Sequence, residues 1–199
     1  HITSPTGLVL PVEDLVRELS ARNIDTIIDG AHAPGHVPVD LRALNPTYYT
    51  ANCHKWICSP KGSAFLYVRK DRQQDFRPLV LSNNAEKPRP GRAQFLTEFD
   101  YQGTADYTPF MTIPAAIEAL PRIFGDSFPA EAGLGSGAGP SSSDDWAAIR
   151  AHNTALVLEG RRVLCDALDI EPPAPDSMLG ALCTLILPPH DPERHARLM

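Results

Sequence analysis

Lys55 lies in a short run of reactive side chains, between His54 and Trp56. A lysine amine can attack an aldehyde cofactor and hold it as an imine, provided that the amine is partly desolvated and spends time as the neutral nucleophile. Trp56 and Ile57 form an apolar flank on the C-terminal side of the lysine. The sequence therefore offers Lys55 as a nucleophile for covalent catalysis.

A carboxylate and an imidazole precede this lysine, directly after the apolar run Ile24–Ile28. A buried carboxylate at Asp29 could keep the pyridine nitrogen of pyridoxal phosphate protonated, which the ring needs in order to act as an electron sink. His32, three residues later, could hydrogen-bond the phenolic oxygen of the ring from the same loop. Each residue also has an ordinary interpretation: Asp29 could be a turn former or a helix cap, and His32 a loop histidine.

His54 stands directly before Lys55. In an extended backbone it would point away from the lysine and could donate to a phosphate group. The ordinary alternatives are a partly buried core histidine at position 54 and a solvated surface lysine at position 55. The apolar flank of Lys55 argues against the second alternative.

Two other kinds of site are less well supported. Zinc ligands could come from His32, Cys53, His54 and Cys58, but the sequence has no Cys-x-x-Cys or His-x-x-x-His pair, and adjacent residues project in different directions. We expect no metal. A Cys-His hydrolase would need one thiol with a lowered pKa, and no feature favours one of the four cysteines in this way.

The composition is that of a soluble globular protein. The 199 residues are 43% hydrophobic and carry a net charge of −6, which argues against a nucleic-acid-binding surface. No apolar stretch approaches the roughly 20 residues of a membrane helix, and the four cysteines lack a disulfide-like spacing. We expect a cytoplasmic protein without membrane or nucleic-acid partners. The chain begins without a signal sequence and stops inside a helical pattern, so we expect it to be a fragment of a longer protein.

The first half of the chain predicts a mixed α/β sheet. Apolar residues at i, i+3, i+4 and i+7 after Pro11 predict a short amphipathic helix. Three short runs rich in β-branched and aromatic residues predict strands: Ile24–Ile28, Tyr48–Ala51 and Ala64–Val68. Open α/β sheets bind ligands at the carboxyl ends of their strands, which is where Asp29 and the Lys55 run fall.

The second half predicts two helices and a further strand. One helix covers about Ile113–Ile123, and another begins at Asp144 or Asp145. The second helix carries an apolar stripe formed by Trp146, Ile149, Leu156 and Val163. Residues 179–187 read as a strand. We therefore divide the chain into a large-domain part (1–127), a Gly/Ser/Pro-rich insertion or linker (128–143), and an interdomain helix with the start of a C-terminal small domain (144–199).

Four motifs in order carry a family resemblance. They are Thr3-Ser4-Pro5-Thr6-Gly7, Asp29-Gly30-Ala31-His32-Ala33-Pro34-Gly35, Asn52-Cys53-His54-Lys55-Trp56 and Gly103-Thr104-Ala105-Asp106. Together they resemble the class V aminotransferase family of pyridoxal phosphate enzymes, in particular its isopenicillin N epimerase-like branch. The resemblance implies part of a three-layer α/β/α fold with a mostly parallel sheet, the fold type I of these enzymes, followed by the start of a smaller α+β domain.

The resemblance also implies roles for individual residues. Lys55 would form the Schiff base with pyridoxal 5'-phosphate, Asp29 would pair with the pyridinium nitrogen, and His32 would contact the ring oxygen. His54 matches a phosphate-binding histidine, and Asn52 falls where many relatives place a serine. Gly103 and Thr104 match a loop that reaches the phosphate of the neighbouring subunit's cofactor, which implies a homodimer with shared active sites.

The implied function is that of an enzyme acting on an amino acid, which could contain sulfur, by epimerase- or aminotransferase-like chemistry. A cysteine desulfurase or a carbon–sulfur lyase is the alternative within the family. A non-catalytic relative that serves as a binding subunit is the alternative of another class. The ring-stacking residue and the carboxylate-binding arginine of the family have no counterpart in the 199 residues, so we expect the isolated chain to be inactive.

Overall fold

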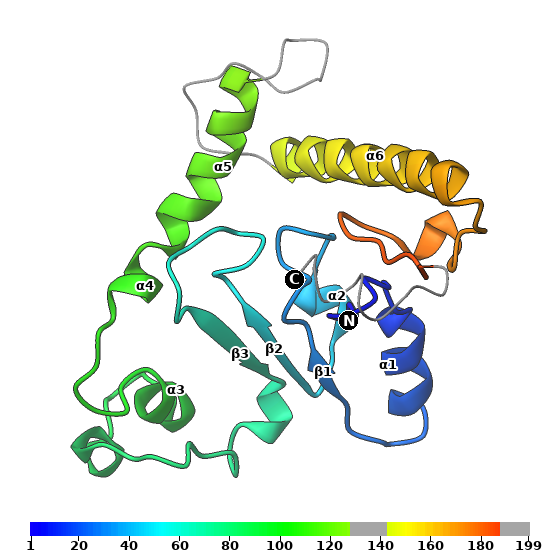
Figure 1. Ribbon diagram of the computed structural model, residues 1–199. Coiled ribbons are helices and arrows are strands. Elements are labelled where there is room, and N and C mark those ends of the chain that lie inside the picture. Colours follow the sequence, from blue (N-terminus) through cyan, green and yellow to red (C-terminus); the bar gives the residue numbers. More distant parts are fainter. Residues whose placement is uncertain (128–142, 188–199) are drawn as a thin grey trace, which may run out of the picture.

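A small mixed sheet forms the centre of the molecule in the computed structural model, which describes residues 1–127 and 143–187 (Figure 1). Its strands are β1 (Ile27–Asp29), β2 (Tyr48–Asn52) and β3 (Ala64–Val68), in the order β1-β2-β3. β1 runs parallel to β2, and β2 runs antiparallel to β3. The predicted mixed sheet is therefore confirmed.

The first strand is shorter than predicted. It begins at Ile27, where pairing with Tyr48 of β2 starts, whereas Asp25 is engaged by the side chains of Arg72 and Thr47. In consequence Asp29 is the last residue of β1 itself.

The core is built around the central strand. Tyr49 and Ala51 of β2 are fully or almost fully buried, as is Val68 at the end of β3. The predicted amphipathic helix is α1 (Val12–Ser20), which buries Val12 and Val16 and lies on the β1 side of the sheet (Figure 1). The short helix α2 (Leu41–Leu44) begins where the Asp40 carboxylate accepts hydrogen bonds from the backbone N–H groups of Arg42 and Ala43.

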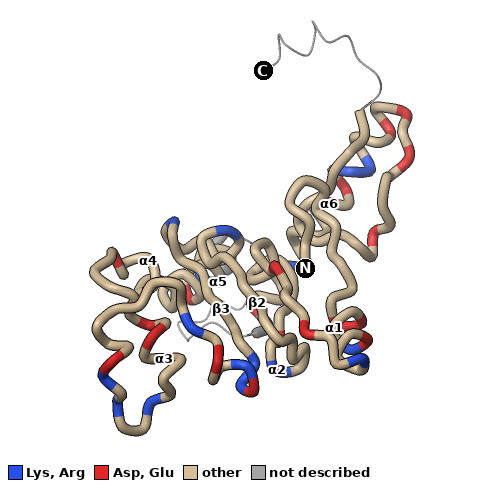
Figure 2. Tube along the Cα trace, turned by 90° about the horizontal axis from the view of Figure 1, so that it is seen from below, with Lys and Arg blue, Asp and Glu red and all other residues tan. Residues whose placement is uncertain are grey.

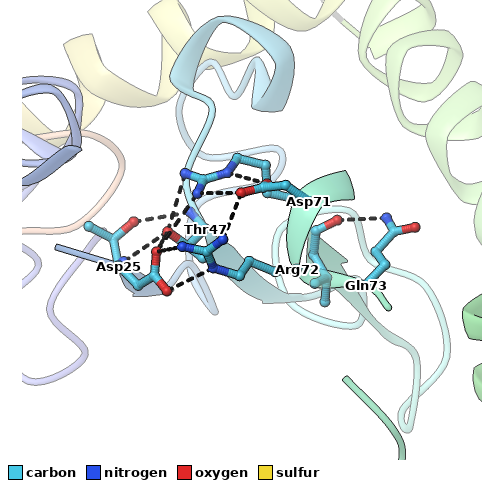
Figure 3. A network of polar contacts seen from close by, with 8 residues as sticks. Asp25, Thr47, Asp71, Arg72 and Gln73 are labelled. Carbon is cyan, nitrogen blue, oxygen red and sulfur yellow. Dashed lines mark hydrogen bonds and ion pairs between the residues drawn. The ribbon is translucent and has the colours of Figure 1, made fainter. Parts of the chain in front are cut away.

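A polar network fixes the strands at the edge of the sheet where β1 and β2 begin (Figure 3). The guanidinium of Arg72, in the 3₁₀ turn η1 (Lys70–Arg72) after β3, donates to both carboxylate oxygens of Asp25 at 3.0 and 3.1 Å. The buried Thr47 hydroxyl also donates to Asp25, and it accepts the backbone N–H of Thr26 at 3.1 Å. These bonds set the register of β1 against β2, and hence the position of Asp29 relative to the residues that follow β2.

Three short elements that follow η1 were not predicted from the sequence. They are the 3₁₀ turn η2 (Asn83–Glu86) and the short helices α3 (Gln94–Phe99) and α4 (Thr108–Met111). An aromatic cluster packs around one of them, α3. Ring centroids of Phe95 and Phe99 lie 4.6 Å apart, and Phe76 stacks on Phe99 at 5.6 Å. The Glu98 carboxylate, 2% exposed, accepts two hydrogen bonds from Arg77, which hold its pKa below the usual range.

Two longer helices follow. α5 (Ile113–Ser127) extends four residues beyond the predicted end, so that Pro121 lies inside it. α6 (Ser143–Leu168) packs against α5, where the Trp146 indole N–H donates to the Ile117 carbonyl at 3.2 Å. Because α6 begins at Ser143, the residues predicted to cap it, Asp144 and Asp145, lie in its first turn instead.

The predicted apolar stripe of α6 is only partly correct. Ile149 is buried, but Leu156 and Val163 are 64% and 49% exposed. The later turns bury Arg161 and Cys165 instead, because the segment after α6 folds back on that face and the Arg161 guanidinium donates to Ala174 and Asp176.

The prediction of a strand at residues 179–187 is wrong. After the 3₁₀ turn η4 (Asp176–Met178), the only ladder contact of this segment with another part of the described chain is a single bridge between Leu179 and Leu8. The neighbouring segment around Leu8 also forms only isolated β-bridges and is not a strand. It therefore provides no continuous row of backbone hydrogen bonds with which residues 179–187 could pair. The predicted linker lies outside the described residues except for Ser143, and the division into domains stays a prediction.

Charges of both signs are interspersed over the described chain, for example along α1 and around α3 (Figure 2). None of the helices in the described residues is long and apolar enough to cross a bilayer.

Candidate active site

Most of the predicted site residues lie at or after the carboxyl ends of β1 and β2, while Gly103 and Thr104 do not. Asp29 ends β1 opposite Thr50, and the Gly30 N–H donates to the Thr50 carbonyl at 2.8 Å. β2 ends at Asn52, three residues before Lys55. Because the two strands are parallel, the loops that follow them emerge from the same edge of the sheet.

Asp29 is anchored by its own loop. One carboxylate oxygen accepts the Ala31 N–H at 2.8 Å, and the side chain is otherwise open to solvent. The next residue, Gly30, has to lack a side chain because the buried Tyr49 ring occupies that space. An added Cβ would lie 2.2 Å from the ring. Burial and the nearby Asp29 raise the pKa of Tyr49, whose hydroxyl bonds His1 Nδ1 at 2.8 Å.

Lys55 and His32 are in direct contact. The lysine Nζ lies 3.1 Å from His32 Nε2, and the Trp56 indole N–H donates to His32 Nδ1 at 3.4 Å. All three side chains are half-buried. Burial and the Lys55 charge lower the pKa of His32, while Asp29 acts in the opposite direction. His32 is therefore neutral at neutral pH and lies in the fields of both the amine and the carboxylate.

The loop that carries Lys55 is closed by hydrogen bonds to Ser63. The Cys53 N–H donates to the Ser63 carbonyl at 3.0 Å, and the buried hydroxyls of Ser59 and Ser63 bond each other. The same Ser63 carbonyl lies 2.9 Å from His54 Nδ1. A carbonyl can only accept, so this contact places the proton of neutral His54 on Nδ1 and leaves Nε2 available.

Two residues to which the sequence analysis gave no individual role, His36 and Gly35, hold Trp56 in place. The ring of His36 packs against Trp56 with centroids 4.3 Å apart and the planes tilted by 39°, and its Nε2 accepts the Ala181 N–H at 2.5 Å. Burial lowers the pKa of His36 to about 4. Gly35, with φ of +82°, packs its Cα face against the Trp56 carbonyl. No sequence signal marked His36, because a second histidine four residues after His32 reads equally well as a loop residue.

The structure thus brings Asp29, His32 and Lys55 together and places His54 beside them on the same loop. Asn52 ends β2 with its side chain half-exposed. Gly103 and Thr104 lie in the loop between α3 and α4, and no contact within the described chain joins them to Lys55. Their predicted role stays a prediction.

The cysteines and a hollow beside α1 are not part of this arrangement. Cys53 is buried, and burial raises the pKa of its thiol, so it is a poor nucleophile. A hollow of about 570 Å³ lies between α1 and the segment Pro38–Asn45, and no lysine lines it. The lysine that lies beside an imidazole, and that could form an imine, is on the loop after β2.

The aminotransferase class-V family is the one whose sequence model matches, over residues 1–123. The chain belongs to this family. Isopenicillin N epimerase from Streptomyces clavuligerus is 32% identical over 95% of the chain and 45% of its own length. A putative L-cysteine desulfhydrase from Oryza sativa subsp. japonica is 31% identical over 94% of the chain and 34% of its own length. The chain thus spans half or less of the length of these relatives.

Among solved structures, the apo cysteine desulfurase from Thermococcus onnurineus NA1 superimposes with a TM-score of 0.59. The match covers 100% of this chain and 45% of that one at 14% identity. At this identity the likeness concerns the fold, which is the fold type I of pyridoxal phosphate enzymes, as predicted.

Members of this family depend on pyridoxal phosphate, and the side chains at the edge of the sheet fit that cofactor. The amine of Lys55 suits its aldehyde, and the second oxygen of Asp29 suits a pyridinium N–H. The imidazoles of His32 and His54 and the amide of Asn52 are suitable partners for its ring oxygen and phosphate.

Proposed function

We propose that the full-length protein is a pyridoxal phosphate-dependent enzyme that acts on an amino acid through Lys55. The observation that carries the proposal is the contact of Lys55 Nζ with His32 Nε2, formed between the loops that follow two parallel strands. A surface lysine would have no reason to meet an imidazole at the carboxyl edge of a sheet, next to an anchored carboxylate.

Each side chain has a role in this proposal. Lys55 would hold the cofactor covalently, Asp29 would face the pyridinium nitrogen, and His32 would face the ring oxygen. Asn52 and His54 would contact the phosphate, for which the free Nε2 of His54 is suitable. The register bonds at the opposite edge and the Ser63 loop closure keep these groups in place before the cofactor binds.

Pyridoxal phosphate supplies an electron sink that stabilises negative charge at the Cα atom of an amino acid. The contribution of the protein is proton transfer and positioning. Lys55 Nζ, once free, is the base that removes the Cα proton and the acid that returns it. His32, with its lowered pKa, stays neutral beside Nζ and so does not repel it.

The relatives favour an amino acid as substrate and leave two reaction types to be distinguished. Epimerisation returns the proton to Cα, whereas desulfhydration eliminates the sulfur substituent from a cysteine. Both start with removal of the Cα proton. The L-cysteine desulfhydrases among the relatives make L-cysteine the first substrate to test.

The experiment measures exchange of the Cα proton in D₂O with the intact protein, by mass spectrometry of added amino acids. Lys55→Ala should reduce exchange by at least about 10³-fold, because it removes the base and the covalent anchor. Lys61→Ala is the matched control, since Lys61 lies six residues away and is exposed on the same loop. We expect Lys61→Ala to exchange at the wild-type rate.

The products separate the alternatives. Sulfide release from L-cysteine identifies a lyase, and a D-amino acid product identifies an epimerase. Exchange that persists in Lys55→Ala would contradict the proposed role of the lysine. If the intact protein neither binds the cofactor nor catalyses exchange, it is a binding subunit and the proposal is wrong.

We also propose that the protein is a homodimer in which Gly103 and Thr104 serve the partner's site. Thr104 is exposed and makes no contact with Lys55 in its own chain as far as the structure describes it. Mixing Lys55→Ala subunits with Thr104→Ala subunits tests this, because hybrid dimers would restore one intact site. Activity that stays at the level of the separate variants would contradict it.

A further inference from the structure

The two nitrogen contacts of His32 compete to set the position of its proton, because Trp56 and Lys55 can both donate to the ring. An indole N–H can donate but never accept, so the bond from Trp56 requires a lone pair on His32 Nδ1. A neutral imidazole carries one proton, which must then lie on Nε2. Nε2 is the nitrogen that lies 3.1 Å from Lys55 Nζ.

In the opposite arrangement Lys55 donates to Nε2, so the proton of His32 lies on Nδ1. The Nδ1–H group and the indole N–H of Trp56 would then face each other, and no hydrogen bond could form between them. Two facts favour the arrangement with Trp56 as donor. The indole N–H of the half-buried Trp56 has no other hydrogen-bond partner among the described residues, and leaving a buried donor unpaired costs free energy. The lysine amine can rotate: as a neutral amine it accepts from Nε2–H through its lone pair, and as an ammonium, which only donates, it turns its N–H groups to water.

We propose that Trp56 is a positioning residue that keeps the proton of neutral His32 on Nε2 and so makes His32 a hydrogen-bond donor toward the Lys55 side of the site. The proposal rests on the proposed function only for its consequence, which is that His32 would donate to the ring oxygen of the cofactor. Trp56 itself touches neither the cofactor nor the substrate in this role.

The surroundings of Trp56 are built to hold its ring. His36 packs against one face, and the backbone of Gly35 packs against the carbonyl of Trp56. His36 is fixed in turn by the Ala181 N–H on Nε2, so it carries its own proton on Nδ1. The groups that face His32 are then the Lys55 amine, the Trp56 indole, the charge of Asp29 and the ring of His36.

The test is ¹⁵N NMR of histidine-labelled, cofactor-free full-length protein, because the protonated and unprotonated ring nitrogens of a neutral histidine differ widely in chemical shift. The signals of His32 are assigned by their loss in His32→Gln. We expect Nε2–H for His32 and Nδ1–H for His36 and His54. The latter two serve as internal references, since their tautomers follow from Ala181 and Ser63.

Trp56→Phe keeps an aromatic ring but removes the donor. We expect the Nε2–H to Nδ1–H ratio of His32 to fall about fivefold, as loss of one hydrogen bond implies, while the tautomer of His54 stays unchanged. Lys55→Met should leave His32 as Nε2–H. An unchanged ratio in Trp56→Phe, or a wild-type His32 protonated on Nδ1, would overturn the proposal.

These outcomes do not depend on turnover. Should the deuterium exchange test fail while His32 keeps the expected tautomer, the proposed function would be wrong and the role of Trp56 would stand. If Trp56→Phe does not fold, the wild-type and Lys55→Met spectra still decide, because a lysine-controlled tautomer would differ between them.

Discussion

Gly35 lies where the loop after β1 meets the loop that carries Lys55, and its replacement by alanine tests how tightly the two loops are packed. Its φ of +82° disfavours any L side chain. An added Cβ would also lie 2.8 Å from the Trp56 carbonyl oxygen, 2.9 Å from its carbon and 3.2 Å from the Ile57 nitrogen. All three are backbone atoms, so the loop itself would have to move.

Gly91 provides a matched control. Its φ is +77°, but nothing lies within 4 Å of an added Cβ. Gly91→Ala should therefore lose only the conformational term, about 1–2 kcal/mol of unfolding free energy. Gly35→Ala should lose that term and a further ~1–3 kcal/mol from overpacking. The folding equilibrium of the two variants would then differ by about 5- to 150-fold.

Urea denaturation of the intact cofactor-free protein measures both variants against wild type. We also expect the labelling rate of Lys55 by an aldehyde reagent to change in Gly35→Ala and not in Gly91→Ala, because the displaced backbone belongs to the residue after the lysine. Equal destabilisation by the two substitutions would refute the packing described between Gly35 and Trp56.

Two further predictions concern pH. The pKa of His36 is about 4 in the folded protein and near 6.5 in an unfolded chain. As the pH falls, the unfolded state therefore binds a proton at His36 before the folded state does. Wild type should therefore lose about 2 kcal/mol of unfolding free energy between pH 7 and pH 5, and His36→Gln should lose less, as urea midpoints at the two pH values would show. If both proteins respond equally, burial of a neutral His36 is contradicted. The hydrogen bonds from Arg72 hold the pKa of Asp25 below its usual value, so that carboxylate stabilises the fold above about pH 4 and the effect disappears as pH falls through the lowered pKa. Asp25→Asn should be less stable than wild type at pH 7, and in thermal melts the difference should shrink as the pH falls below about 4; a constant difference would argue against the ion pair.

The sequence predicted the part of the site that depends on strand order. Short β-branched runs marked β1, β2 and β3, and parallel pairing of the first two brings Asp29 and the Lys55 loop to one edge. The proximity of an amine and an imidazole, Lys55 and His32, could therefore be inferred from the strand order, whereas the roles of these residues and of Asp29 stay a prediction.

Other features could not be read from the sequence because they depend on contacts between distant segments. The packing of His36 against Trp56 and the bond from Ala181 join residues up to 145 positions apart. The exposure of Leu156 on α6 reflects which face the returning segment covers, a choice that the apolar periodicity does not contain. Residues 179–187 have β-forming composition but lack a paired strand beside them.

The most direct test of the central claim is to find the lysine that carries the cofactor. The intact protein is incubated with pyridoxal phosphate, reduced with borohydride, digested and analysed by peptide mass spectrometry. We expect the reduced adduct on the peptide that contains Lys55, and none on that peptide in Lys55→Arg. An adduct confined to another lysine, or a protein that acquires no adduct, would contradict the assignment of this site.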